Sequence, residues 1–182
     1  MVNFTLLSAF FAAASLATAS PTVYLIRHGE KPDDGNGLNA QGLQRAQCLR
    51  SVFGSSSQYN IGHIMAQTPK SSTFVASKSK IQINTDVLDG KRQRPLDTDL
   101  MVDTSCDRDD SKCVKDVVKG YVGSGNILIC WEHDALTDIV EELGDDDAPK
   151  YDDDSFDIIW TDPSPYDSIT EKTSENCPGL DN

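Results

Sequence analysis

Two short stretches place a histidine beside a charged residue at the end of an apolar run. In VYLIRHGE, Arg27 and His28 follow the apolar residues 23–26, and in ILICWEH, Glu132 and His133 follow the apolar residues 127–131. An imidazole can act as a nucleophile or exchange protons, and a guanidinium can hold an oxyanion with two parallel hydrogen bonds. In open α/β sheets, ligands bind beyond the carboxyl ends of the strands. We therefore expect both histidines at that end of a sheet.

Several other kinds of site are excluded because their motifs are missing. The chain has no GxxxxGK[ST] loop, no GxGxxG after a strand and no GxSxG turn. It has no CxxC pair, and its three histidines are far apart in sequence, so the spacing does not suggest zinc. The sequence therefore gives no reason to expect a metal or a cofactor.

The overall charge limits the possible partners. The 182 residues carry a formal net charge of −13, and such a surface repels nucleic acid and anionic lipid. We expect neither a nucleic acid nor a membrane as a partner. Any anion must bind in a local pocket of positive groups, and the sequence does not indicate an oligomeric state.

The pattern of apolar residues predicts alternating strands and helices. Alternating elements of this kind are typical of one α/β domain, and Asn39 and Gly144 suit the start of the first helix and the end of the last. A tail from residue 161 is expected to be irregular. The predicted strands are 22–26, 59–66, 127–131 and 156–160, and the predicted helices are 38–53, 114–121 and 134–143.

The first predicted helix has one apolar face. Leu43, Ala46, Leu49 and Val52 or Phe53 recur at helical spacing and are expected to face the core. Arg45 falls outside this set, so we expect it to be solvated, as is usual for an arginine on a surface helix.

The N-terminus and the cysteines indicate export. Residues 1–19 carry no charge, are apolar in the middle and end in Ala-Thr-Ala, which predicts a secretory signal peptide cut after Ala19 and a domain over residues 20–182. Export makes disulfides possible. Of the five cysteines, Cys106 and Cys113 bracket a short polar loop and are predicted to form a local bridge, whereas Cys130 lies in an apolar strand and suits a buried thiol.

These stretches together resemble the histidine phosphatase superfamily, the phosphoglycerate mutase-like proteins, and in particular its short secreted fungal members. The most specific element is LIRHGE at residues 25–30. The resemblance covers most of residues 21–143, and its further elements are LNAQGLQRA at 38–46, IMAQTPK at 64–70, RPLDT at 94–98 and EH at 132–133.

The resemblance implies an α/β three-layer sandwich with a mostly parallel central sheet. It implies that His28 is a nucleophile that takes up a phosphoryl group, that Arg27 and Arg94 hold the phosphoryl oxygens, and that His133 completes the pocket. Arg92 is a rival for the place of Arg94.

The general acid stays open among four carboxyl groups: Asp103, Asp107, Glu132 and Asp134. The implied protein is a secreted phosphomonoesterase that acts on a small phosphorylated substrate. The alternative is a catalytically impaired or non-catalytic member of the same fold, because the segment after Arg94 is too short for the helix that the family has there.

Overall fold

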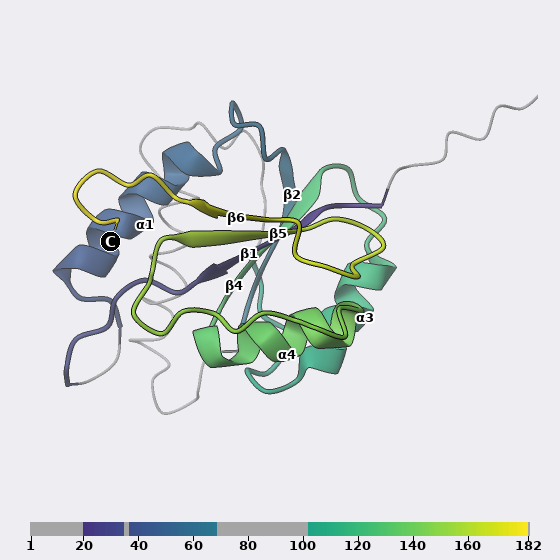
Figure 1. The fold of residues 1–182 in the computed structure, drawn as a ribbon. Helices are drawn as coiled ribbons and strands as arrows, with labels where there is room; N and C mark the ends of the chain where they lie inside the picture. Colours follow the sequence, from purple (N-terminus) through teal and green to yellow (C-terminus); the bar gives the residue numbers. More distant parts are fainter. Residues whose placement is uncertain (1–19, 35–36, 69–101, 182) are drawn as a thin grey trace, which may run out of the picture.

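A six-stranded sheet forms the centre of the computed structural model, which describes residues 20–34, 37–68 and 102–181 (Figure 1). The strand order is β3-β2-β4-β1-β5-β6. The strands are β1 (Val23–Arg27), β2 (Ile61–Ala66), β3 (Val102–Asp103), β4 (Asn126–Trp131), β5 (Ile158–Asp162) and β6 (Glu171–Ser174), and the helices are α1 (Ala40–Val52), α3 (Ser111–Gly120) and α4 (His133–Leu143).

The sheet is parallel through its first four strands. β1 pairs in parallel with β4, β4 with β2, and β2 with β3, whereas β5 and β6 are added in antiparallel orientation beyond β1. The two central strands β1 and β4 are nearly continuous apolar runs, as expected for strands that are covered on both faces. The predicted mostly parallel α/β sheet is confirmed.

Alternate side chains of the central strands enter two cores on opposite faces of the sheet. Leu25 and Ile129 pack in a cluster with residues of α3 and α4, whereas Ile26 and Leu128 pack with Leu49 of α1. This follows from the period of two in a strand. Figure 1 shows α3 and α4 on one side of the sheet and α1 on the other, so the predicted three layers are also confirmed.

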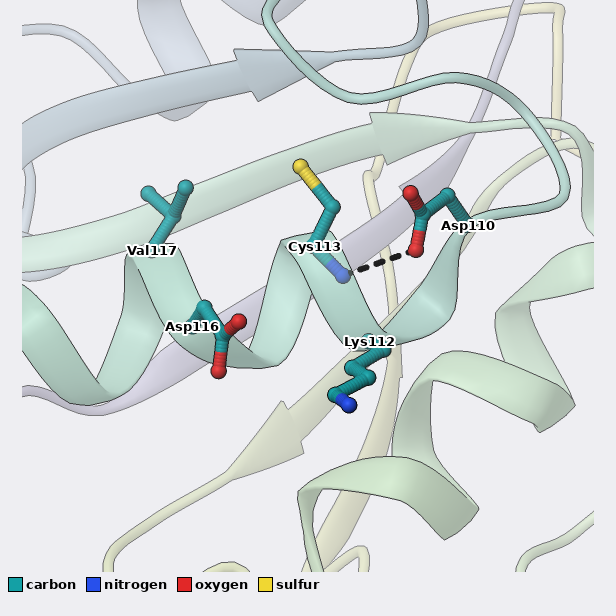
Figure 2. Close-up of a pocket in the computed structure, with 5 residues that line it drawn as sticks. All are labelled: Asp110, Lys112, Cys113, Asp116 and Val117. Atoms are coloured by element: carbon teal, nitrogen blue, oxygen red, sulfur yellow. Dashed lines mark hydrogen bonds between the residues drawn. The ribbon is translucent and has the colours of Figure 1, made fainter.

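The start of α1 and the end of α4 follow the predicted signals. The side chain of Asn39 accepts a hydrogen bond of 2.9 Å from the backbone N–H of Gly42 at the start of α1. Gly144, at a φ of 149°, ends α4, a conformation that glycine adopts without strain. At the start of α3, Asp110 accepts from the N–H of Cys113 at 3.0 Å (Figure 2).

The predicted inner face of α1 was wrong at two positions. Leu43 is 39% exposed, and Arg45, which was expected in solvent, is only 1% exposed. The guanidinium of Arg45 can be buried because it is paired there with Glu30 and Glu175, and a buried charge is tolerated when it is paired and hydrogen-bonded.

The C-terminal tail is more ordered than expected. Instead of being irregular throughout, it contributes β6, which pairs with β5 at one edge of the sheet. A disulfide between Cys48 of α1 and Cys177 then ties the end of the chain to α1.

The predicted Cys106–Cys113 bridge is confirmed. Cys130 lies in β4 and belongs to neither of the two disulfides. None of the described helices is long and apolar enough to cross a membrane. The predicted signal peptide at 1–19 and the arginines Arg92 and Arg94 lie outside the described residues.

Candidate active site

The carboxyl ends of β1 and β4 bring the Arg27–His28 pair and the Glu132–His133 pair to one place. The two strands are parallel neighbours, with Arg27 opposite Trp131, and the backbone N–H of His28 donates to the carbonyl of Trp131 at 3.0 Å. His28, Glu132 and His133 therefore meet beyond the same end of the sheet, as the sequence predicted for the two histidines.

The ring of His28 is held in one orientation. Its Nδ1 is 2.8 Å from the backbone carbonyl of Gly29, and a carbonyl only accepts, so Nδ1 carries the proton of this hydrogen bond. The second ring nitrogen, Nε2, points at the carboxylate of Glu132 at a distance of 3.0 Å. Nε2 is therefore the nitrogen of His28 that faces the other groups of the site.

Glu132 is the centre of the cluster. Its Oε1 lies 3.0 Å from Nε2 of His28 and 3.1 Å from Nδ1 of His133, and its Oε2 accepts from Nζ of Lys31 at 2.7 Å. Hydrogen bonds from His28 and Lys31 hold the pKa of Glu132 well below its usual range, although burial acts in the opposite direction. Glu132 is thus an ionised carboxylate between two imidazoles.

Arg27 lies directly before the cluster and is held by the loop after α4. Its Nη1 donates to the carbonyls of Asp153 and Ser155 at 2.6 and 2.9 Å, and its Cζ lies 3.8 Å from the centre of the Phe156 ring. Burial lowers the pKa of Arg27, but an arginine stays charged even so. The Nε of Arg27 is buried and has no hydrogen-bond partner among the described residues.

His133 is the first residue of α4. Its Nδ1 faces Glu132, and its Nε2 lies 3.2 Å from Asp134 and 3.6 Å from Asp153. The backbone N–H groups of a helix N-terminus favour a bound anion. The start of α4 therefore adds to the positive groups at this end of the sheet.

Of the four carboxyl groups considered as the general acid, only Glu132 has a contact with His28 among the described residues. Asp134 contacts His133, and Asp103 lies 3.5 Å from His63 on β2. Asp107 accepts through its backbone carbonyl from the N–H of Asp110 before α3. The geometry thus favours Glu132 over the other three carboxyl groups as the candidate general acid.

Sequence reasoning missed the role of Arg45 behind this site. Its Nε and Nη2 donate to Glu30 at 3.0 and 2.8 Å, its Nη1 donates to Glu175 at 2.8 Å, and Nη2 also donates to the carbonyl of Leu180 at 2.6 Å. Glu30, two residues after His28, is thereby held by α1. Glu175 is far from Arg45 in sequence, so no local signal could have revealed this pairing.

Described residues also line two surface hollows away from this site. One is formed along α3 by Asp110, Lys112, Cys113, Asp116 and Val117 (Figure 2). The other is formed between α1 and the C-terminal tail by residues that include Cys48, Tyr59 and Glu175. Neither hollow is lined by a member of the His28 cluster.

No protein-family model and no curated protein sequence matches this chain. Among solved structures, the chain is similar to a protein described as the phosphohistidine phosphatase SixA from Agrobacterium tumefaciens, at a TM-score of 0.52 and 10% identity over 86% of this chain and 99% of that one. A second similar structure is described as an α-ribazole-5′-P phosphatase from Escherichia coli, at a TM-score of 0.42 and 13% identity over 85% and 94%. The first likeness shows the fold, which is the fold that the resemblance in sequence implied.

Proposed function

We propose that this protein is a phosphomonoesterase that works through a phosphohistidine intermediate on His28. One observation carries this proposal: the Nδ1 proton of His28 is engaged by the carbonyl of Gly29, so that Nε2 is directed toward Glu132, beside a buried arginine. The fold of the SixA structure is consistent with this chemistry, and so is the LIRHGE motif.

In the first step, Nε2 of His28 forms a bond to phosphorus while the bond from phosphorus to the leaving oxygen breaks. The negative charge that spreads over the phosphoryl oxygens needs fixed positive donors. Arg27 supplies one, and Arg94, which lies outside the described residues, is proposed as the second. His133 and the N-terminus of α4 complete the pocket.

The leaving oxygen needs a proton, and Glu132 is placed to supply it. A phosphoryl group bound beside Glu132 would favour its neutral form, because two negative charges so close repel each other. The proton shared between Nε2 of His28 and Oε1 of Glu132 would then move to Glu132. This transfer frees the lone pair of His28 for attack and leaves Glu132 ready to protonate the leaving group. Water then attacks the phosphohistidine, releases phosphate and restores His28.

The test is hydrolysis of an aryl phosphate by the purified protein from acid to neutral pH, beside the variant His28→Ala. We expect activity that His28→Ala abolishes and a covalent phosphoprotein that is labile to acid and stable to base. His63→Ala is the matched control, since His63 lies on β2 beside Asp103. A folded protein without activity would instead indicate the non-catalytic alternative.

We also propose that the protein is secreted after removal of residues 1–19. The two disulfides, Cys48–Cys177 and Cys106–Cys113, support this proposal, because disulfides persist in oxidising compartments. The N-terminal residue of the exported protein is expected to be Ser20, and N-terminal sequencing checks it. Recovery of the intact N-terminus from inside the cell would contradict it.

A further inference from the structure

Three side chains of types that bind metal ions converge at the site. Nε2 of His28, Oε1 of Glu132 and Nδ1 of His133 all lie within 4.8 Å of one another. The carboxylate oxygen is 3.0 Å from one imidazole nitrogen and 3.1 Å from the other. Two imidazoles and one carboxylate are the protein ligands of many catalytic zinc sites.

The two distances from the Glu132 oxygen to the imidazole nitrogens are close to those between ligands of a bound zinc ion. Zinc binds imidazole nitrogen and carboxylate oxygen at about 2.0–2.2 Å, which places neighbouring ligands of a tetrahedron roughly 3.4 Å apart. The observed separations of 3.0 and 3.1 Å need to widen only by a few tenths of an ångström.

Each of the three ligands is also oriented by a second group. Nδ1 of His28 donates to the carbonyl of Gly29 at 2.8 Å, and Oε2 of Glu132 accepts from Lys31 at 2.7 Å. Nε2 of His133 lies 3.2 Å from a carboxylate oxygen of Asp134. Histidines that ligate a metal almost always give their second nitrogen to a carbonyl or a carboxylate. The cluster thus has the outer contacts of a metal site as well as the ligands.

The type of ligand selects the metal. Imidazole nitrogens suit zinc and other late transition metals, whereas magnesium and calcium prefer oxygen ligands. The three side chains are 13–15% exposed, so an ion can reach them from solvent. Three protein ligands leave a fourth position on zinc for water.

We propose that His28, Glu132 and His133 form a zinc-binding site. Zinc bound there occupies the lone pair of Nε2 of His28, so the ion blocks attack on phosphorus and inhibits the enzyme. This regulatory consequence rests on the proposed phosphatase function, whereas the binding of zinc does not. Zinc and a phosphoryl substrate would then compete for the same nitrogen.

The binding test uses the tag-free, disulfide-bonded protein, stripped with a chelator and titrated calorimetrically with a zinc salt. We expect one zinc ion per chain and, with cobalt in its place, the visible absorption of a tetrahedral site. Glu132→Gln and His133→Asn should each weaken zinc binding by about tenfold or more. His63→Asn is the matched control and should bind as the unaltered protein does, and circular dichroism checks the fold of each variant.

A second group of possible metal ligands nearby is the alternative that the binding test must exclude. His133, Asp134 and Asp153 also lie close enough together to hold an ion. If Asp134→Asn abolishes zinc binding while Glu132→Gln retains it, the ion belongs to that second group and the proposed site is wrong. Absence of saturable zinc binding by the folded protein would also overturn it.

Hydrolysis of an aryl phosphate with and without zinc separates the two proposals. Hydrolysis that zinc suppresses and the chelator restores supports the regulatory role. Hydrolysis that saturating zinc leaves unchanged overturns that role. Zinc binding without any hydrolysis would retain the metal site and reject the phosphatase, whereas hydrolysis without zinc binding would do the reverse.

Discussion

At the scale of single residues, the site differs from a simple anion pocket because a carboxylate lies in front of His28, the proposed nucleophile. Glu132 contacts His28, His133 and Lys31, so a phosphoryl group can reach Nε2 of His28 only if Glu132 moves or takes up a proton. In the proposed mechanism, Glu132 therefore controls access to His28 and also provides a proton for the leaving group.

We predict that Glu132→Gln lowers kcat for an alkyl phosphate by about 10²–10⁴, the usual contribution of a positioned general acid. The loss should be much smaller for an aryl phosphate with an acidic leaving group, because that group departs without a proton. Initial-rate measurements with the two substrates check this.

Asp103→Asn and Asp107→Asn are the matched controls for this prediction, since both residues were considered for the same role and neither contacts His28 among the described residues. Equal losses with both substrates in Glu132→Gln, or a larger loss in either control, would assign the proton to another group.

At the scale of elements, the fold behind the site depends on how α1 is joined to the C-terminal tail. Arg45 of α1 is paired with Glu30 and Glu175, and Cys48 of α1 is bonded to Cys177. The same tail contributes β6 to the edge of the sheet (Figure 1). The tail thus closes the fold and fixes the loop that carries His28.

We predict that Arg45→Met destabilises the protein by about 3–5 kcal/mol, because two carboxylates would lose their buried partner. Denaturation in urea measures the change. Gln44→Met, an exposed position on the same helix, is the control and should have little effect.

The triple variant Arg45→Met, Glu30→Gln, Glu175→Gln should recover much of the lost stability, since no unpaired charge is then buried. If Arg45→Met alone proves as stable as the control, the buried ion pairs do not hold the tail.

The two disulfides should contribute unequally. The Cys48–Cys177 bridge spans 129 residues and the Cys106–Cys113 bridge spans 7. In the chain-entropy model the first stabilises by about 5 kcal/mol and the second by about 2.5 kcal/mol. We therefore expect the Cys48→Ala, Cys177→Ala variant to melt well below the Cys106→Ala, Cys113→Ala variant in thermal denaturation. The opposite order would mean that the short bridge holds native structure that loop entropy does not describe.

At the scale of the whole molecule, the protein carries a net charge of −13. One of its carboxyl groups, that of Asp162, is buried, so the stability of the fold should depend on pH. Asp162 of β5 has no exposed surface, and neither of its carboxyl oxygens has a hydrogen-bond partner among the described residues. Burial, together with the nearby Asp145 and Asp167, raises the pKa of Asp162 to about 7.

This raised pKa makes a stability prediction with a definite sign. The folded protein binds the proton of Asp162 more tightly than the unfolded chain does. The stabilisation that this proton gives to the fold is therefore complete below about pH 4 and is lost as the pH rises toward 7. The loss amounts to at most about 4 kcal/mol, since one pKa unit corresponds to about 1.4 kcal/mol.

Asp162→Asn should therefore remove this decline, so that its stability relative to the unaltered protein increases from acid to neutral pH. Urea denaturation across that range measures it. The exposed Asp146→Asn is the control, and parallel pH curves for the unaltered protein and Asp162→Asn would show that Asp162 does not bury a proton.

The sequence by itself was sufficient for the local features of this protein. The apolar runs of β1 and β4, the cap at Asn39, the stop at Gly144 and the short Cys106–Cys113 bridge depend on neighbouring residues, so their pattern can be read along the chain. The expectation that His28 and His133 lie at one end of the sheet was also correct, because parallel strands place their carboxyl ends together.

Only the tertiary structure decided the contacts between distant segments. The buried Arg45, the Cys48–Cys177 bond and the strand β6 all depend on partners more than a hundred residues away or on the edge of the assembled sheet. A charged residue is expected in solvent unless a partner accompanies it inside, and only the folded chain identifies that partner. The choice among the candidate carboxyl groups also depended on the tertiary structure. The pairing of β1 with β4 places Glu132 against His28.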